Sequence, residues 1–425
     1  MGDGTISAMR ASNLGLVGKY WHVGIPVIAV AFLSSALSIG SSNYAFGFYV
    51  DPLEDTFGWS RTDIGFSLSL AAIASLTTPY IGRLMDTYGA RPIMVGSLVL
   101  LGISFVIRPL MTELWHLYAL SIVQFAAFSG TNVLPMGRLV GLWFPNARGR
   151  VMGIAMMGNN FGGLTIPKLT AYLLVMSSWQ SAFLVTGLIA FGIAAMALFI
   201  VRERPTSNET VLKGVGQMVE QKTTIVGLTV RQVLRTSTFY YMTIATALGA
   251  FTYSALLPHI STHLIDEGTD SATVGTLFAL LAAFGMGGKA VFGFLSDRYS
   301  ARQAMMLSLG GQTVFITVIA LFPTGVHLWI LLPIFGFFFG AYGVLVTLLV
   351  QECFGLKYFG SVSGVSGIVA VVPTVAGPLI AGASSDHLGS YAPAFIGVAI
   401  TFAIAILLLT QVGRPLETLA DEQPA

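Results

Sequence analysis

Long apolar segments recur along the whole chain and are separated by short polar stretches. Each has about the 20 residues that an α-helix needs to cross a bilayer. The pattern predicts twelve membrane-spanning helices, at residues 23–49, 62–83, 92–111, 115–141, 150–175, 180–202, 236–262, 273–295, 303–322, 327–351, 361–385 and 391–412. Of the 425 residues, 55% are hydrophobic and only 9% charged, and the mean hydropathy is +0.79. We therefore expect an all-α integral membrane protein, embedded in the lipid bilayer.

The charged residues are divided unevenly between the two sides of the membrane. With the N-terminus in the cytoplasm, sixteen of the twenty-one Lys and Arg lie on the inner side and only Arg61 lies clearly outside. The outer loops carry acidic residues instead: Asp51, Glu54, Asp55, Asp63, Asp266, Glu267 and Asp270. The positive-inside rule then predicts a multi-pass protein of the plasma (inner) membrane with both termini in the cytoplasm. The first apolar run is too long for a signal peptide, so we expect it to remain as the first helix.

An internal repeat divides the chain into two units. GRLMDTYGARPIM at 82–94 recurs as GFLSDRYSARQAM at 293–305, an offset of 211. The same offset relates residues of helices 5 and 11, namely Gly149, Val151, Gly153 and Pro167 to Gly360, Val362, Gly364 and Pro378. The predicted organisation is a tail at 1–22, six-helix bundles at 23–202 and 236–412, a cytoplasmic linker at 203–235 and a tail at 413–425. Two parallel halves of this kind are typical of secondary transporters that bind substrate between the halves.

The repeated motif resembles the signature of the major facilitator superfamily on the loop between helices 2 and 3. That signature is a Gly, an Asp four residues on, then a Gly and a basic residue, and here it reads Gly82, Asp86, Gly89 and Arg91. The second copy keeps Gly293 and Asp297, with Arg298 and Arg302, but has Ser300 in place of the internal glycine. The resemblance covers nearly the whole chain and implies a twelve-helix transporter with pseudo-two-fold symmetry. We expect it to function as a monomer.

An Asp at a helix end can pair with Arg or accept hydrogen bonds from the first amides of another helix. Asp86 and Asp297 are therefore expected to hold adjacent helices together on the inner face. In the family, such contacts are held to stabilise the outward-open state and to break for inward opening. The alternative is that these charges only anchor the loops on the cytoplasmic side.

Three stretches resemble a narrower branch, the monocarboxylate porters and oxalate/formate antiporters. YAFGFYVDPLEDTFGWSRTDIGFSLSL at 44–70 is similar to their first outer loop, chiefly through Phe-Gly-Trp-Ser-Arg at 57–61. WFPNARGRVMGIAMMGNNFGG at 143–163 and the later AGPLIAGASSDHLGSYAPAF also resemble that branch. These similarities indicate the branch and not the substrate.

Lys289 is the most informative charge within the predicted spans. The spans contain four basic residues, Arg108, Arg138, Lys168 and Lys289, and no Asp or Glu lies squarely within one. A charge there costs roughly 3 kcal/mol even at a helix centre, so it normally faces a wet cavity or a partner. Lys289 is surrounded by glycines and corresponds in the first repeat to the neutral Thr78. A cation without a built-in counterion predicts a site for an anion.

The resemblance sharpens the prediction for Lys289. The monocarboxylate and oxalate porters resemble one another in having a basic helix 8 residue just before the inner-loop Gly and Asp, and there it is held to bind the substrate carboxylate. Lys289 occupies that position, although Lys is a point charge where Arg would grip both oxygens. The alternative is a lysine that snorkels inward. The animal porters also have an Asp one turn earlier, where this chain has Gly285, so their proton mechanism cannot be transferred.

The other basic residues of the spans allow two interpretations each. Lys168, beside Pro167, is either a second substrate contact or a structural cation bonded to helix carbonyls. Arg138, five residues before Trp143, either lines the substrate path or snorkels to the inner interface. Arg108 stands at the outer end of helix 3, where Glu113 is close enough in sequence to neutralise it, and we assign it no function.

Neutral and titratable side chains add further candidates. Helices 1, 4, 7 and 10 line the cavity in the family, so Asn132, Tyr44 and Tyr342 are expected to line it here, with helix packing as the alternative. His259, near the outer end of helix 7, is a candidate proton-coupling group, as is Lys289 itself.

The leading hypothesis is an alternating-access carrier of a small organic anion, a monocarboxylate, that moves with a proton or in exchange for another anion. The alternative is a proton-driven exporter of drug-like or cationic compounds, which predicts a membrane-embedded carboxylate. An enzyme is not expected, because no nucleophile with its base, phosphate loop or cofactor site is present. The single cysteine, Cys353, excludes an intrachain disulfide and a cysteine-based metal cluster. We expect no metal, cofactor or nucleic-acid partner.

Overall fold

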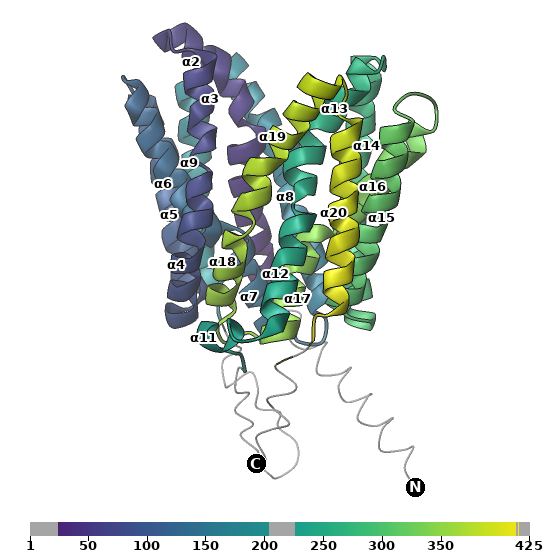
Figure 1. The fold of residues 1–425 in the computed structure, drawn as a ribbon. Coiled ribbons are helices and arrows are strands. Elements are labelled where there is room, and N and C mark those ends of the chain that lie inside the picture. The colour runs from purple at the N-terminus through teal and green to yellow at the C-terminus, as the bar shows by residue number, and fades with distance from the viewer. Residues whose placement is uncertain (1–23, 204–225, 414, 416–425) are drawn as a thin grey trace, which may run out of the picture.

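The computed structural model describes residues 24–203, 226–413 and 415, and its elements in these ranges are helices. Ten of the helices are long and apolar enough to cross a membrane. Two more lie beside them in Figure 1, α8 (Arg148–Met176) and the interrupted helix formed by α12 (Ser237–Gly249) and α13 (Leu257–Asp266). The predicted all-α fold with twelve spanning helices is confirmed.

The first half of the chain supplies six spanning segments. They are residues 24–44; α3 (Arg61–Ser69) with α4 (Ala72–Tyr88); α5 (Ala90–Ile107); α6 (Leu114–Thr131) with α7 (Val133–Trp143); α8; and α9 (Trp179–Ile200). A short helix, α2 (Val50–Phe57), joins the first two segments.

The second half supplies six more. They are α12 with α13; α14 (Ser271–Arg298); α15 (Ala301–Leu321); α16 (Leu328–Gly340) with α17 (Tyr342–Phe354); α18 (Phe359–Ile368) with α19 (Val371–Leu388); and α20 (Ala392–Thr410). The short helix α11 (Val230–Val233) precedes them.

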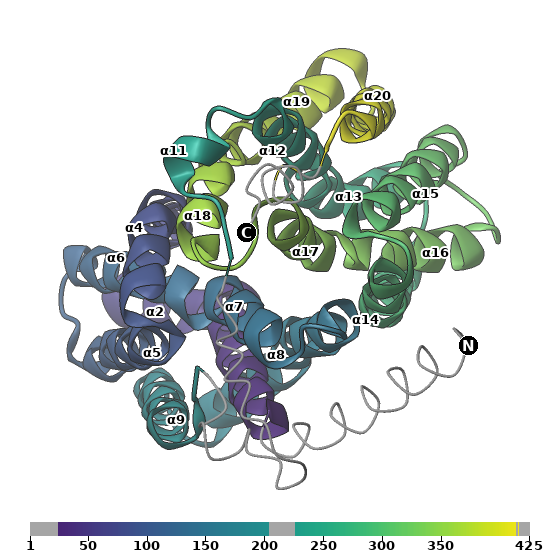
Figure 2. The same cartoon turned by 90° about the horizontal axis from the view of Figure 1, so that it is seen from below.

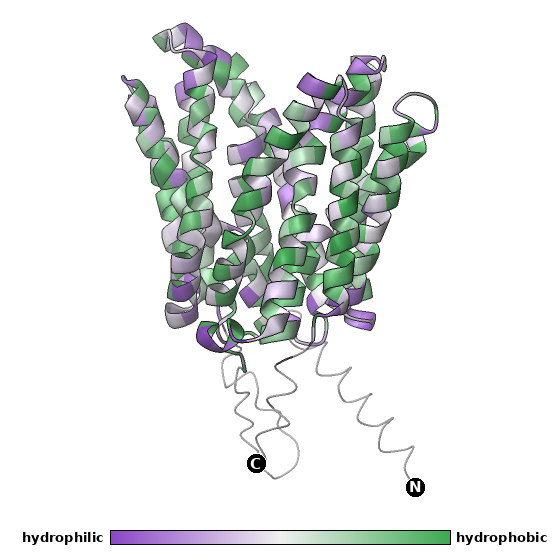
Figure 3. Cartoon of the chain, in the orientation of Figure 1, coloured by the Kyte–Doolittle hydropathy of each residue, from purple (hydrophilic) through white to green (hydrophobic). Residues whose placement is uncertain are grey.

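The two halves form two groups of helices, purple to teal and teal to yellow in Figure 2. Figure 1 shows that the groups converge at the end where α11 lies and diverge toward the other end. We call the end where α11 lies the inner end, because the positive-inside rule predicts that it faces the cytoplasm. The opposite end is called the outer end. Figure 3 shows hydrophobic residues along the length of the helices, as a lipid-facing surface requires.

The halves meet at the inner end through glycines at repeat-equivalent positions. A Cβ built on Gly82 would lie 2.1 Å from the carbonyl oxygen of Gly360, and one on Gly293 would lie 2.3 Å from that of Gly149. The repeat offset of 211 relates Gly82 to Gly293 and Gly149 to Gly360. Both inter-half contacts therefore depend on backbones that approach more closely than any side chain allows.

Two π-helical turns interrupt the spans at nearly equivalent positions. They are η1 (Gly40–Tyr44) in helix 1 and η4 (Thr252–Leu256) in helix 7. Helix 4 is also interrupted, at Asn132, where φ is −124° and ψ is −116°. π-Turns are uncommon and often occur at functional sites.

The Phe-Gly-Trp-Ser-Arg run forms the outer turn between helices 1 and 2. Gly58, with φ of 69°, ends α2 in the left-handed conformation, and the Ser60 hydroxyl caps the first turn of α3. Phe57 stacks on Trp59 at 4.3 Å between ring centroids. Arg61 pairs with acidic residues of α2, at 2.9 and 2.7 Å. The motif is thus accounted for as a capped turn.

Candidate functional site

Lys289 lies between the two halves, on α14 and against α8. Its side chain is buried, at 8% exposure, and its ammonium donates hydrogen bonds to the Met156 carbonyl oxygen at 3.2 Å and to Asn160 Oδ1. Small residues permit this, because a Cβ on Gly153 would lie 2.3 Å from the Lys289 carbonyl oxygen and one on Gly288 would lie 1.9 Å from that of Phe337. At Lys289, the helix α14 is therefore packed closely between α8 on one side and α16 on the other.

The contacts of Lys289 leave its charge uncompensated. Both acceptors are neutral, and no carboxylate of the described residues lies within 4 Å of the ammonium. An ammonium has three donors, and the described contacts use two of them. The arrangement can accept one further ligand, and an anion would be the best match in charge.

Next to Asn160, a network of small polar side chains links helix 1 (residues 24–44), helix 4 (α6 with α7) and helix 5 (α8). The Ser35 hydroxyl donates to Asn132 Oδ1 at 2.6 Å and also contacts Asn159 Oδ1. Asn132 is 4% exposed and sits at the interruption of helix 4. The structure thus places Asn132 in a contact between helices. Through Ser35 it is linked to Asn159, the neighbour of Asn160 in the sequence.

Three tyrosines lie close to one another, Tyr44 in the first half and Tyr253 and Tyr342 in the second. Tyr44 is 52% exposed, and a Cβ on Gly163 of α8 would lie 3.0 Å from its ring. Tyr253, from the other half, is 46% exposed and close enough to Tyr44 for their hydroxyls to interact electrostatically. The Tyr342 ring lies 5.8 Å from that of Tyr253, and its hydroxyl is bonded to the Thr246 carbonyl. Tyr44 and Tyr253 are the accessible members of this group.

Lys168 is exposed and lies elsewhere on α8. It is eight residues, about 12 Å, beyond Asn160 toward the outer end. At about 100° per residue it shares a side of the helix with Phe161 and Tyr172, which are 41% and 61% exposed. The structure does not bring Lys168 together with Lys289.

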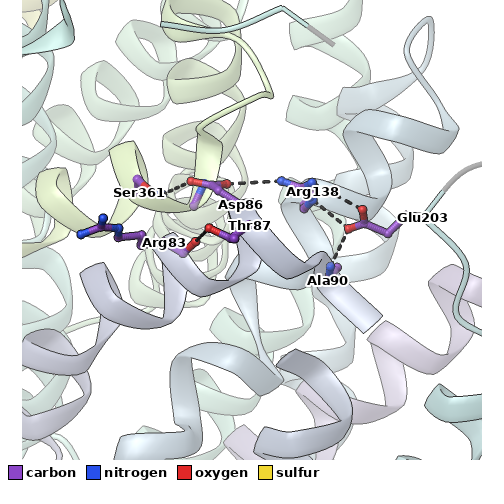
Figure 4. A network of polar contacts seen from close by, with 8 residues as sticks. Arg83, Asp86, Thr87, Ala90, Arg138, Glu203 and Ser361 are labelled. Carbon is purple, nitrogen blue, oxygen red and sulfur yellow. Dashed lines mark hydrogen bonds and ion pairs between the residues drawn. The ribbon is translucent and has the colours of Figure 1, made fainter. Parts of the chain in front are cut away.

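Arg138 belongs to a buried ion-pair network at the inner end. Its guanidinium lies 3.3 Å from Asp86 Oδ1 and 2.8 Å from Glu203 Oε1, and Figure 4 shows it between the two carboxylates. Glu203 in turn accepts a hydrogen bond from the Ala90 amide, the first of α5. Neither snorkelling nor an open path describes this environment, because both hydrogen-bonding edges of the guanidinium are occupied.

Asp86 joins this network to the other half. Its two oxygens accept hydrogen bonds from the amides of Gly360 at 3.0 Å and Ser361 at 2.7 Å, at the start of α18 (Figure 4). A carboxylate at a helix N-terminus is favoured by the amide donors and by the helix dipole. The predicted contact between Asp86 and helix N-terminal amides is present.

Asp297 makes the equivalent contact in the second repeat. It accepts from the amides of Gly149 at 2.7 Å and Arg150 at 3.0 Å, at the start of α8, and pairs with the Arg150 side chain at 3.1 Å. The Glu352 carboxylate accepts from the Ala301 amide at 2.7 Å, as Glu203 does from Ala90. The repeat equivalent of Arg138 is Leu349, so this latch has no arginine at the position of Arg138.

The remaining motif residues also lie at the inner end. Gly89 has φ of 96°, and a Cβ there would lie 2.8 Å from the Glu203 carboxyl carbon. Arg302 donates to the Val412 carbonyl at 2.7 Å. Arg91 and Arg298 are exposed at the inner end, as the positive-inside rule expects.

His259 lies in the first turn of α13, in the outer part of helix 7. Its Nδ1 lies 2.9 Å from the Ala255 carbonyl oxygen, and its ring lies 5.4 Å from that of Tyr391. His263, one turn on, is buried. No group of three or more His, Cys, Asp or Glu that could hold a metal ion occurs in the part of the chain that the structure describes.

Sequence comparison extends over almost the whole chain. The sequence model of the Major Facilitator Superfamily matches residues 30–378. The oxalate:formate antiporter of Oxalobacter formigenes is 24% identical, with 97% of each chain covered. Monocarboxylate transporter 11 of Homo sapiens is 24% identical, with 92% of this chain and 82% of that one covered. In structure, the chain is similar to the proton:xylose symporter XylE, at a TM-score of 0.69, 13% identity and coverage of 94% and 99%.

Proposed function

The chain belongs to the major facilitator superfamily, and from this premise we propose that it is an alternating-access carrier of a small organic anion. The substrate class we propose is a monocarboxylate, bound by Lys289. The predicted resemblance to the family is confirmed by the match over residues 30–378. The relatives named above, an oxalate:formate antiporter and a monocarboxylate transporter, support an anionic substrate.

The uncompensated ammonium of Lys289 is the observation that carries this proposal. Two unit charges about 4 Å apart attract by roughly 4 kcal/mol at an effective dielectric constant of about 20. That attraction is comparable with the roughly 3 kcal/mol that an isolated lysine costs within a membrane. A bound carboxylate therefore offsets the cost, and it fills the donor that Met156 and Asn160 leave unused.

The neighbouring side chains favour a monoanion over a dianion. Arg138 is engaged by Asp86 and Glu203, and Lys168 lies beyond the outer side of the site. Among the described residues of α8 and α14, Lys289 is therefore the one buried cation that remains for the substrate. Tyr44, Tyr253 and Asn160 supply hydroxyl and amide groups for the rest of the molecule.

The two latches account for alternation between the open states. The halves are joined at the inner end and diverge at the outer end (Figure 1), as an outward-facing state requires. Inward opening has to break the bonds of Asp86 to α18 and of Asp297 to α8. Substrate binding promotes the change only if the substrate stabilises the closed or inward-facing states more than the outward-facing one. Neutralising Lys289 does so, because closure removes that charge further from water.

We also propose that the protein is a monomer of the plasma membrane with both termini in the cytoplasm. The exposed Arg91, Arg150 and Arg298 at the inner end support this orientation. Coupling is to a proton or to a counter-anion.

Uptake into proteoliposomes tests the role of Lys289. Labelled lactate, pyruvate, oxalate and benzoate are offered to the wild-type protein and to the variants Lys289→Met, Lys289→Arg and Lys168→Met. We expect Lys289→Met to lower uptake of the transported acids at least about 100-fold, corresponding to about 2.7 kcal/mol of lost binding. Lys289→Arg keeps part of the activity because it keeps the charge. Lys168→Met, which removes an exposed lysine from α8, is the matched control.

Full uptake by Lys289→Met would refute the proposal. Transport of a cationic drug that is driven by a pH gradient, together with no transport of any carboxylate, would instead establish the exporter alternative. Thermal unfolding of each variant in detergent separates a lost site from a lost fold.

A further inference from the structure

Besides Lys289, a second buried cation without a carboxylate partner among the described residues lies at the outer end of α5. Arg108 is 2% exposed, and its guanidinium lies 4.6 Å from the ring centroid of Phe105 and 5.0 Å from that of Phe183. Within the described ranges no carboxylate lies within 4 Å of it. Glu113, the neutralising residue expected from the sequence, caps α6 instead. The role of Arg108 at this position must therefore be something other than forming an ion pair.

The arginine imposes a direction on a chain of hydrogen bonds. A guanidinium only donates, so Gln124 must turn its Oε1 toward Arg108, and Nη2 lies 2.5 Å from that oxygen. The amide nitrogen of Gln124 then faces the other way and donates to Ser42 Oγ at 2.7 Å. Gln124 and Ser42 are 3% and 1% exposed. With both partners shielded from water, reversing the amide would leave unpaired buried groups.

Ser42 lies in the middle of the π-helical turn η1. π-Turns are rare, and the bond from Gln124 ties this one to helix 4. Two residues after Ser42, Tyr44 projects as an exposed side chain beside Gly163 and near Tyr253 of the other half. The contact that fixes Ser42 therefore also influences the position of Tyr44, which belongs to the same turn.

The second half shows what such a turn looks like without an arginine. In η4, Thr252 Oγ1 donates to Gln312 Oε1 at 2.7 Å, and Gln312 Nε2 lies 3.2 Å from Ser308 Oγ. A buried glutamine thus supports each π-turn, but the amide is reversed. The repeat equivalent of Arg108 is Ile319, so only the first half has an arginine at this position to fix the amide direction.

We propose that Arg108 is a positioning residue for the substrate-facing part of helix 1. It orients Gln124, Gln124 holds Ser42, and Ser42 holds the turn that presents Tyr44 to the opposite half. The effect on transport rests on the proposed function, because it requires the substrate to pass Tyr44. The effect on the position of Tyr44 does not.

The position of residue 44 is tested without any substrate. Tyr44→Cys is introduced together with Cys353→Ser, which removes the native cysteine, and the rate of modification by N-ethylmaleimide is measured. We expect Ser42→Ala, Gln124→Leu and Arg108→Met each to change this rate at least about threefold and in the same direction. Arg108→Lys restores it toward the starting value, because lysine still donates to Gln124 Oε1.

Ser104→Ala is the matched control for the labelling experiment. Ser104 is a fully buried serine of α5 that bonds within its own helix, to the Leu101 carbonyl at 2.7 Å. Its removal should lower the melting temperature without changing the labelling rate. Labelling at the starting rate in all three chain variants overturns the proposal, and so does an equal change in Ser104→Ala.

The transport readout is the KM of each panel acid that the wild-type protein carries. Ser42→Ala is expected to raise KM about fivefold with a nearly unchanged maximal rate, whereas a purely structural defect would lower the maximal rate. An unchanged KM contradicts the proposed effect on substrate binding. If Lys289→Met transports normally, the proposed function fails, and the labelling rates still decide the role of Arg108.

Discussion

Replacing Gly82 by alanine should force the inner end of the molecule open. The built Cβ would lie 2.1 Å from the Gly360 carbonyl oxygen, whereas ordinary van der Waals contact begins at 3.4 Å. Helices α4 and α18 must therefore separate by about 1.3 Å, the difference between these distances. Asp86 bonds the amides of Gly360 and Ser361 at 3.0 and 2.7 Å, and that movement would lengthen and weaken both bonds.

The size of the effect follows from the strain and the weakened bonds. Overpacking costs typically about 1–3 kcal/mol, and a hydrogen bond to a charged group contributes about 1.5–3 kcal/mol. A partial loss of about 1.5–3 kcal/mol shifts the population away from the inner-closed state by roughly 10- to 150-fold. The higher helix propensity of alanine acts equally on both states and cancels from this ratio.

Pulsed electron–electron resonance between spin labels measures the change. Labels are attached through Thr87→Cys and Lys357→Cys, two exposed positions at the inner end, in a Cys353→Ser background. We expect Gly82→Ala to add a longer distance to the distribution. Gly96→Ala, at a helical glycine with nothing within 4 Å of a built Cβ, should leave it unchanged. A distribution that is the same in both variants would show that the glycine contact does not hold the inner end closed.

Three further predictions concern the charges. Arg138→Met should lower the free energy of unfolding by about 1–3 kcal/mol, because the buried Asp86 and the part-exposed Glu203 lose their cation and keep only their bonds to backbone amides. Denaturant unfolding in detergent measures this, and a loss below about 0.5 kcal/mol would argue against the network. Adding Asp86→Asn to Arg138→Met should recover part of the loss, and strictly additive effects would show that the two residues do not interact. If the protein exchanges its substrate for a counter-anion, a carboxylate trapped inside the liposomes should accelerate uptake of the labelled acid. If it is a proton symporter, an imposed inward proton gradient should accelerate uptake instead. An uptake rate that responds to neither would contradict both modes of coupling.

The spans and the repeat could be predicted because both depend on the local sequence and not on tertiary contacts. Apolar length alone defines the spans, and the shared offset relates Gly82 to Gly293 without any knowledge of packing. The amide contacts of Asp86 and Asp297 could be anticipated from helix-end chemistry. Their partners, the starts of α18 and α8, could not, because they lie about 275 and 148 residues away in the chain.

What could not be predicted depends on tertiary packing. Glu203 was assigned to the linker by its polar surroundings, yet it bonds to Arg138 and to α5. The π-turn of GSSNY has one glycine, Gly40, but glycines are common along these spans and do not distinguish it from an ordinary helix. The side-chain contact of Ser42 with Gln124, which supports the turn, is a tertiary contact. Arg108 was paired with Glu113 because they are close in sequence, whereas the structure places it against two phenylalanine rings.

Carboxylate binding to purified protein tests the central claim most directly, because it requires no assumption about coupling. The melting temperature in detergent is followed for wild-type protein and Lys289→Met as lactate, pyruvate, oxalate and benzoate are titrated. A ligand at 100 times its Kd stabilises the folded state by about 2.7 kcal/mol, so at least one acid should raise the melting temperature of the wild-type protein and leave that of Lys289→Met unchanged. Equal stabilisation of both proteins would contradict the assignment of Lys289 as the anion-binding residue.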